Sequence, residues 1–108
     1  MVRLTVTLRP SARGVHDLVD AFRFLIVSTR IEPGCLGCSV WTDPDSRVHY
    51  VEEWSSETDI RRRVGSERFT SVLALLESVR EAPHVQFDFV SVTRGLDYVE
   101  EVRQHSAR

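Results

Sequence analysis

The sequence predicts an α+β fold of the ferredoxin-like type, with the order β-α-β-β-α-β and helices on one face of a four-stranded antiparallel sheet. Three observations predict it. Residues 2–8 alternate strictly between apolar and polar, residues 12–31 show helical periodicity, and two strand patterns meet at a turn over residues 43–46. A chain of 108 residues is the size of one domain.

The first strand and the first helix follow from periodicity. Apolar residues occupy every second position in residues 2–8, which is typical of a strand with one buried face. Pro10 ends this strand, and Ser11 is the predicted N-cap of a helix over residues 12–31. Pro33-Gly34 then stops the helix.

A hairpin is predicted next. Residues 35–42 and 47–54 both read as strands, and Asp43-Pro44-Asp45-Ser46 between them has the residue types that turns favour. Because the connection is short, the two strands must pair antiparallel.

The second half of the chain supplies the remaining helices and a strand. Ser56 is the predicted N-cap of a short helix that Gly65 ends. Ser66 is the predicted cap of the next helix, which Pro83 ends. Alternation predicts a fourth strand over residues 85–94.

The C-terminus carries a weak helical stripe over residues 96–104. We therefore divide the chain into a domain over residues 1–94 and an extension over residues 95–108. The extension is expected to be helical and to pack on the domain or on a partner subunit.

Composition excludes several classes of function. The net charge is −2 and argues against a nucleic-acid binder. All 14 basic residues are arginine, so Schiff-base and lysine-base chemistry is impossible, and asparagine is also absent. The sequence contains no signal-peptide pattern and no apolar stretch long enough to span a membrane, so we expect a cytoplasmic protein.

The Cys35-Leu36-Gly37-Cys38 motif begins a predicted strand, whereas the redox motif of this type begins a helix. On a regular strand, residues three apart point to opposite faces. No second pair of cysteines or paired histidines is available for zinc. We interpret the two cysteines as packing residues, and predict neither a metal site nor a cofactor.

The sheet face away from the helices is predicted to be mixed in polarity and to include Thr5, Val51, Val90 and Val92. Such a surface is large enough to pair with a copy of itself. We therefore expect a homodimer through the sheet face.

The most informative stretch is the third strand, where alternation puts Tyr50, Glu52 and Trp54 on one face. Arg63 follows Ile60 by three residues and is expected to turn inward. A buried carboxylate costs several kcal/mol unless it is paired. Two interpretations stay open: Glu52 pairs with Arg23 or Arg63 and holds the helix layer to the sheet, or these residues form a reaction site.

Several segments together resemble the antibiotic biosynthesis monooxygenase family. They are residues 32–37, Asp43-Pro44-Asp45, Val51-Glu52-Glu53-Trp54 and Ser66-Glu67-Arg68-Phe69. The resemblance covers roughly residues 2–94. It implies a dimeric α+β barrel with a small hydrophobic pocket between the sheet and the helices. The candidates for lining that pocket are Phe22, Phe69, Leu73 and Leu76.

The resemblance implies a cofactor-independent monooxygenase that oxidises a small reduced aromatic or quinol-type substrate with O₂. Glu52 and Tyr50 would provide the proton path, Arg63 would stabilise an anion, and Trp54 would stack on the substrate. The alternative is a non-catalytic dimer that binds a small hydrophobic or aromatic ligand.

The chain departs from the family's catalytic patterns. Members that oxidise anthrones share Trp54, but they have asparagine where this chain has Tyr50, and tyrosine where it has Ile60. Their arginine falls near Ala74. Members that degrade haem use an asparagine, a tryptophan and a histidine, and the last two fall at Arg63 and Leu73.

Overall fold

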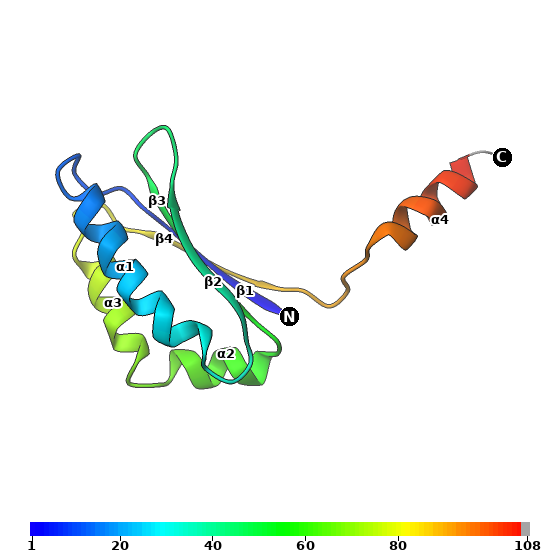
Figure 1. Cartoon of the computed structure of the whole chain (residues 1–108), viewed down its shortest axis with the longest axis horizontal. Coiled ribbons are helices and arrows are strands. Elements are labelled where there is room, and N and C mark those ends of the chain that lie inside the picture. Colours follow the sequence, from blue (N-terminus) through cyan, green and yellow to red (C-terminus); the bar gives the residue numbers. More distant parts are fainter. Residues whose placement is uncertain (107–108) are drawn as a thin grey trace.

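The computed structural model describes residues 1–106 and contains a four-stranded sheet with helices on one side (Figure 1). The strands are β1 (Val2–Leu8), β2 (Cys35–Thr42), β3 (Val48–Trp54) and β4 (His84–Phe89). The helices are α1 (Val15–Arg30), α2 (Glu57–Val64), α3 (Phe69–Glu77) and α4 (Leu96–Ser106). The predicted α+β ferredoxin-like order is confirmed, with α4 added after it.

The sheet is antiparallel throughout, with strand order β2-β3-β1-β4. In the register of the two central strands, Leu4 lies opposite Glu52 and Val6 lies opposite Tyr50. Paired residues of neighbouring strands share a face. The alternating residues of β1 and the Tyr50-Glu52-Trp54 series of β3 therefore point together toward the helices.

The core lies between this inner face and the helices. α1 packs over β2 and β3 and alongside α3, and it buries Leu18, Phe22 and Ile26. In β4, Val85, Phe87 and Phe89 lie opposite inward-pointing residues of β1 and therefore also point to the inner face. They are nevertheless 39–60% exposed. The helical layer thus covers the β2–β1 part of the sheet and leaves β4 largely open.

Several element boundaries differ from those predicted, and α3 ends at Glu77 and not at Pro83. Gly14 and not Ser11 is the N-cap of α1. Residues 11–14 form a separate turn before the helix, because the Gly14 N–H donates to the Ser11 carbonyl. α3 begins at Phe69, since the Ser66 hydroxyl donates to the Arg63 carbonyl at 2.7 Å and so belongs to the preceding turn. β4 ends at Phe89 and not at residue 94.

The two cysteines lie on the same face of β2, and the prediction of opposite faces was wrong. A register shift between Cys35 and Gly37 inserts an extra residue, so that Cys35 lies opposite Trp54 and Cys38 lies opposite Glu52. Both thiols are free.

The extension after residue 94 forms α4, which points away from the rest of the chain (Figure 1). None of its residues is buried. Its contact with the domain or with a partner stays a prediction, and residues 107–108 lie outside the described part. Among residues 1–106, no helix is both long and apolar enough to cross a membrane.

Candidate functional site

The carboxylate of Glu52 is the centre of a buried polar cluster. Its Oε1 accepts hydrogen bonds from Trp54 Nε1 at 2.9 Å and from Arg63 Nε at 3.1 Å. Its Oε2 accepts from Arg63 Nη2 at 2.9 Å and from the Tyr50 hydroxyl. Arg63 is thus bidentate, the strongest geometry for such a pair. The prediction that Arg63 turns inward is confirmed.

Arg63 ties this carboxylate to the end of α1 and to the turn that follows it. Its Nη1 donates to Glu32 Oε2 at 2.9 Å, and its Nη2 donates to Thr29 Oγ1 at 3.2 Å. The guanidinium also lies 5.3 Å from the ring centre of Phe69. Burial would lower the pKa of Arg63, but the hydrogen bonds and charge of Glu52 outweigh it and raise that pKa. The arginine is permanently cationic and cannot serve as a base.

The cluster continues toward β2 through Tyr50. The Cys38 thiol donates to the Tyr50 hydroxyl at 3.3 Å, and Phe22 stacks on the Tyr50 ring with centroids 4.5 Å apart. Burial, with the Glu52 charge second, raises the pKa of Tyr50. Burial raises the pKa of Cys38 to about 12. Both groups are therefore protonated at neutral pH.

The cluster is closed to solvent. Tyr50 and Glu52 are 0% exposed, Trp54 is 1% exposed and Arg63 is 3% exposed. No buried side-chain nitrogen or oxygen atom within residues 1–106 lacks a hydrogen-bond partner. The four predicted catalytic residues are thus brought together, but as packed and fully bonded side chains.

The predicted pocket-lining residues are divided between the interior and the surface. Phe22 and Phe69 are buried beside the cluster, whereas Leu76 is half-buried and Leu73 is 43% exposed. Their role in binding stays a prediction.

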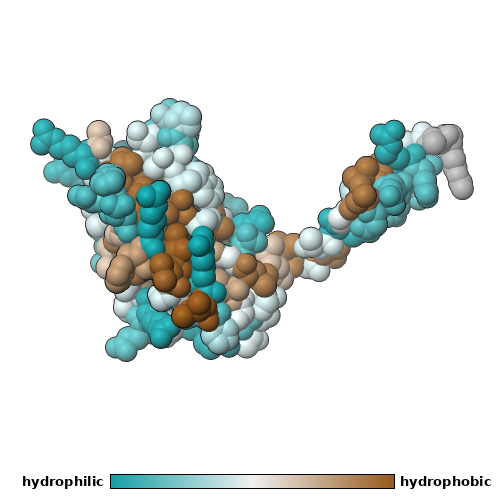
Figure 2. Space-filling view, viewed as in Figure 1, coloured by the Kyte–Doolittle hydropathy of each residue, from teal (hydrophilic) through white to brown (hydrophobic). Residues whose placement is uncertain are grey.

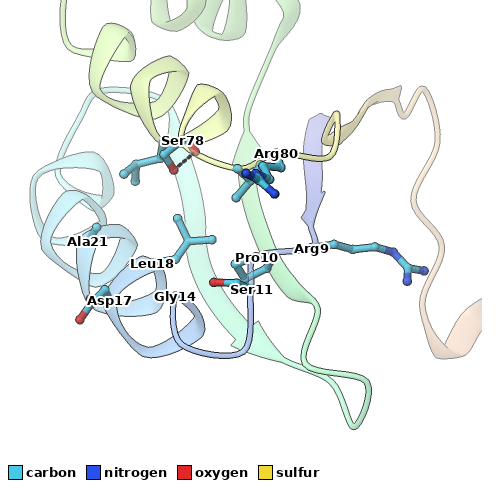
Figure 3. Close-up of a pocket in the computed structure, with 11 residues that line it drawn as sticks. Arg9, Pro10, Ser11, Gly14, Asp17, Leu18, Ala21, Ser78 and Arg80 are labelled. Carbon is cyan, nitrogen blue, oxygen red and sulfur yellow. Dashed lines mark hydrogen bonds between the residues drawn. The ribbon is translucent and has the colours of Figure 1, made fainter.

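An open cleft of about 590 Å³ lies elsewhere, between the start of α1 and the end of α3 (Figure 3). Leu18, Leu75 and Val79 provide the apolar wall, Arg9 and Arg80 provide two positive charges, and Asp17 provides one negative charge. Leu18 points from α1 into this space (Figure 3). The apolar periodicity of the helices contained Leu18 and Val79, but nothing in the sequence placed Arg9 and Arg80 at the edge of the same cleft.

The outer face of the sheet carries a second polar group. Trp41 stacks on His49 with ring centroids 5.4 Å apart, and His49 Nε2 lies 2.7 Å from Asp43 Oδ2. His49 lies on the face opposite Trp54, as predicted, because alternate residues of β3 face opposite ways. Among residues 1–106, no group of three or more metal-ligating side chains comes together.

The family model described as antibiotic biosynthesis monooxygenase matches residues 1–75, which is more than half of the chain. The chain belongs to this family. The resemblance noted from the sequence is therefore confirmed for fold and family.

Solved structures agree with this fold. A crystal structure described as an antibiotic biosynthesis monooxygenase is 20% identical with a TM-score of 0.70, over 85% of this chain and all of its own. A protein from Mycobacterium tuberculosis is 17% identical with a TM-score of 0.75, over 87% of this chain and 98% of its own. A conserved protein from Methanosarcina mazei is 19% identical with a TM-score of 0.72, over 81% of this chain and 89% of its own. No curated protein matches the sequence.

This member of the antibiotic biosynthesis monooxygenase family has an arginine at position 63, where the resemblance would place a histidine in many members. A neutral histidine can accept a proton, whereas Arg63 can only donate hydrogen bonds. In this chain Arg63 is half of a buried ion pair with Glu52.

Proposed function

We propose that this protein is a small-ligand-binding member of the antibiotic biosynthesis monooxygenase family. One observation carries the proposal: the Tyr50-Glu52-Trp54-Arg63 cluster is closed and fully hydrogen-bonded, while the cleft between α1 and α3 is open. A substrate would have to displace a bidentate ion pair to reach Glu52. Removing one partner of such a pair costs about 3–5 kcal/mol.

The cleft favours a small amphipathic molecule with an apolar or aromatic body and an acidic group. Leu18 and Leu75 would contact the body, and Arg80 would attract the acidic group. A volume of about 590 Å³ lies within the range of small-molecule sites.

The test uses anilinonaphthalene sulfonate, an anionic aromatic probe whose fluorescence rises on binding. Ala21→Trp fills the cleft from α1 and should weaken binding at least about tenfold, by excluded volume. Ala74→Trp on the exposed surface of α3 is the matched control and should leave binding unchanged. Equal binding by both variants would refute the cleft as the site.

A second candidate is a cofactor-independent monooxygenase acting on a reduced aromatic or quinol. The family match supports it, and so does the continuous hydrogen-bonded path from Cys38 through Tyr50 to Glu52. In this case the helices must open to admit substrate beside Trp54. Deprotonation of the substrate by Glu52 would give an electron-rich anion that O₂ can oxidise.

Oxygen uptake decides between the two candidates. The purified, metal-free protein is tested over a panel of anthrones and hydroquinones, with the uncatalysed rate subtracted. Uptake that disappears in folded Glu52→Gln and Trp54→Ala variants would establish the oxygenase. No uptake over the panel leaves the ligand-binding function as the conclusion.

We further propose a homodimer through the outer sheet face, where Thr5 and Val51 are half-buried and Trp41 is 47% exposed. Val51→Arg would place a charge at the centre of this surface. It should shift the protein toward monomer in sedimentation equilibrium, whereas Ala74→Arg on the exposed surface of α3 should not. An unchanged dimer in Val51→Arg would refute this face as the interface.

A further inference from the structure

Two helices carry apolar stripes that are largely exposed in the described chain. On α1 the stripe consists of Phe24, Val27 and Ile31, which are 81%, 73% and 81% exposed. On α4 it consists of Leu96, Val99 and Val102, which are 72%, 49% and 42% exposed. Spacings of three and four residues put each set on one side of its helix. Figure 2 shows an apolar surface over α1 crossed by long hydrophilic side chains, and an apolar patch on α4.

The charges beside the two stripes are complementary. Arg23 and Arg30 are seven residues apart, so they lie on the same side of the α1 stripe. Within residues 1–106, the only ion pair of Arg23 is with Asp20, at 3.9 Å, whereas Arg30 Nε donates to the Cys38 carbonyl at 3.0 Å. Arg23 is therefore the arginine available to a partner. On α4 the charged residues are mainly acidic: Asp97 and Glu101 pair with Arg94, and Glu100 enters none of the ion pairs found within residues 1–106.

We propose that α4 of one copy packs on the α1 stripe of a second copy, with Glu100 facing Arg23. The two stripes then bury each other, as amphipathic helices do when their ridges pack into grooves. This contact goes beyond the proposed function and is separate from the sheet-face contact.

The chain's own α1 is out of reach of α4. α1 lies over β2 and β3, whereas α4 follows β4 at the opposite edge of the sheet. With strands about 4.8 Å apart and layers about 10 Å apart, the outer side of α1 is roughly 20 Å from β4 through the protein, and farther around it. From Val90, which is hydrogen-bonded to Met1, six Cα–Cα steps lead to Leu96 and span at most about 20 Å when extended, which is less than the path around the protein. The length of this segment does not prevent α4 from reaching α1 of a second copy.

The first test measures dimer dissociation of the full-length chain by sedimentation equilibrium. Phe24→Asp and Val99→Asp should each raise the dissociation constant at least about tenfold. Together they should raise it little further, because both remove the same contact. Val64→Asp is the matched control, since Val64 lines an apolar groove between α2 and β4 with Phe87 and Phe89. A loss of dimer in Val64→Asp alone would place α4 in that groove and overturn the proposal.

The second test asks whether the contact joins two copies. A Val27→Cys chain is mixed with an isotopically labelled Val99→Cys chain under mild oxidation. Mass spectrometry should find the disulfide between the labelled and the unlabelled chain. With Glu77→Cys on α3 in place of Val27→Cys, the yield should fall to the background set by Cys35. Equal yields from the two mixtures would overturn the proposal.

A third test reverses the charges of Arg23 and Glu100 to check that these two residues face each other. Arg23→Glu should weaken the dimer, and Arg23→Glu combined with Glu100→Arg should restore it. Neither residue is buried in the single chain, so circular dichroism should show unchanged folding in all variants. Failure of the restoration would overturn the pairing of these two residues.

Discussion

At the scale of single residues, Glu52 is satisfied by four donors from three side chains. Two of those side chains, Tyr50 and Trp54, come from its own strand, at positions two before and two after it. The third, Arg63, comes from α2 and also holds Glu32 just after α1. The buried carboxylate thus fastens the sheet to two parts of the helical layer.

Removing Arg63 alone should therefore lower the free energy of unfolding far more than removing Arg63 and Glu52 together. Arg63→Met leaves Glu52 buried with an unpaired charge and should lower the free energy of unfolding by about 3–5 kcal/mol. Arg63→Met with Glu52→Leu removes both charges and should cost clearly less than the sum of the two single changes. Urea unfolding followed by circular dichroism measures all three; strictly additive losses would contradict this account.

Asp43, in the turn before β3, should make the free energy of unfolding depend on pH in the acidic range. The hydrogen bond from His49, with further bonds from the Arg47 and Asp45 backbone, lowers the pKa of Asp43 from 3.8 to about 2. A carboxylate whose pKa is lower in the folded state stabilises the fold above pH 3.8 and loses this contribution as the pH falls through about 2.

Asp43→Asn should remove this part of the acid dependence. The urea midpoint of the wild-type protein should fall more steeply than that of Asp43→Asn between about pH 4 and pH 2. Asp45→Asn in the same turn is the control and should follow the wild type more closely. Parallel curves for wild type and Asp43→Asn would contradict the prediction.

At the scale of elements, the turn between α1 and β2 depends on a glycine. Gly34 has φ of 85°, a conformation that side chains rarely adopt, and a Cβ there would lie 2.3 Å from Asp59 Cγ. Asp59 cannot easily move, because Ser56 and Arg62 both donate to its carboxylate. This close approach sets α2 against the start of β2.

Gly34→Ala should destabilise the protein by about 1–3 kcal/mol, through backbone strain and the clash together. In an Asp59→Ala background the same substitution should cost less, because only the backbone strain remains. Gly37→Ala is the matched control, as nothing lies within 4 Å of a Cβ at that position. Thermal unfolding measures each variant, and equal losses for both glycines would refute the argument.

The elements were predictable where one local signal decided them. Alternation defined β1 and β3, and Ser56 accepts the Asp59 backbone N–H as the predicted cap of α2. Ser11 and Ser66 were predicted as caps for the same reason but do not cap a helix. The Ser11 carbonyl accepts a hydrogen bond within a turn, and the Ser66 hydroxyl donates to the Arg63 carbonyl. The bulge at Cys35–Gly37 had no sequence signal beyond a glycine.

The candidate site was predictable in part. Strand alternation put Tyr50, Glu52 and Trp54 together, and helical geometry required one of three consecutive arginines to turn inward. The choice of Arg63 over Arg23, and the complete exclusion of solvent, depend on how α2 meets β3. Periodicity within single elements carries no information on that contact.

At the scale of the whole molecule, the domain and its extension should differ in stability. The central strands β1 and β3 are paired on both sides, whereas α4 has no buried residue. An isolated helix of eleven residues is marginal in water. Hydrogen exchange at low protein concentration should therefore be fast throughout α4 and slow in β1.

That contrast should depend on concentration. If α4 packs on α1 of a second copy, raising the protein concentration should slow exchange in α4 and in the second half of α1 together. The Val99→Asp variant should show fast exchange in α4 at every concentration. Slow exchange in α4 of a monomeric sample would contradict this prediction.

The two tryptophans of the chain lie on opposite faces of the sheet and in opposite surroundings. Trp54 is 1% exposed within the polar cluster, and Trp41 is 47% exposed on the outer face. The intrinsic fluorescence therefore has two components, one shielded from a quencher such as acrylamide and one open to it. Unfolding changes the Trp54 component, whereas covering the outer face changes only that of Trp41. A dilution series of the unlabelled protein thus separates the optical signal of assembly from that of folding.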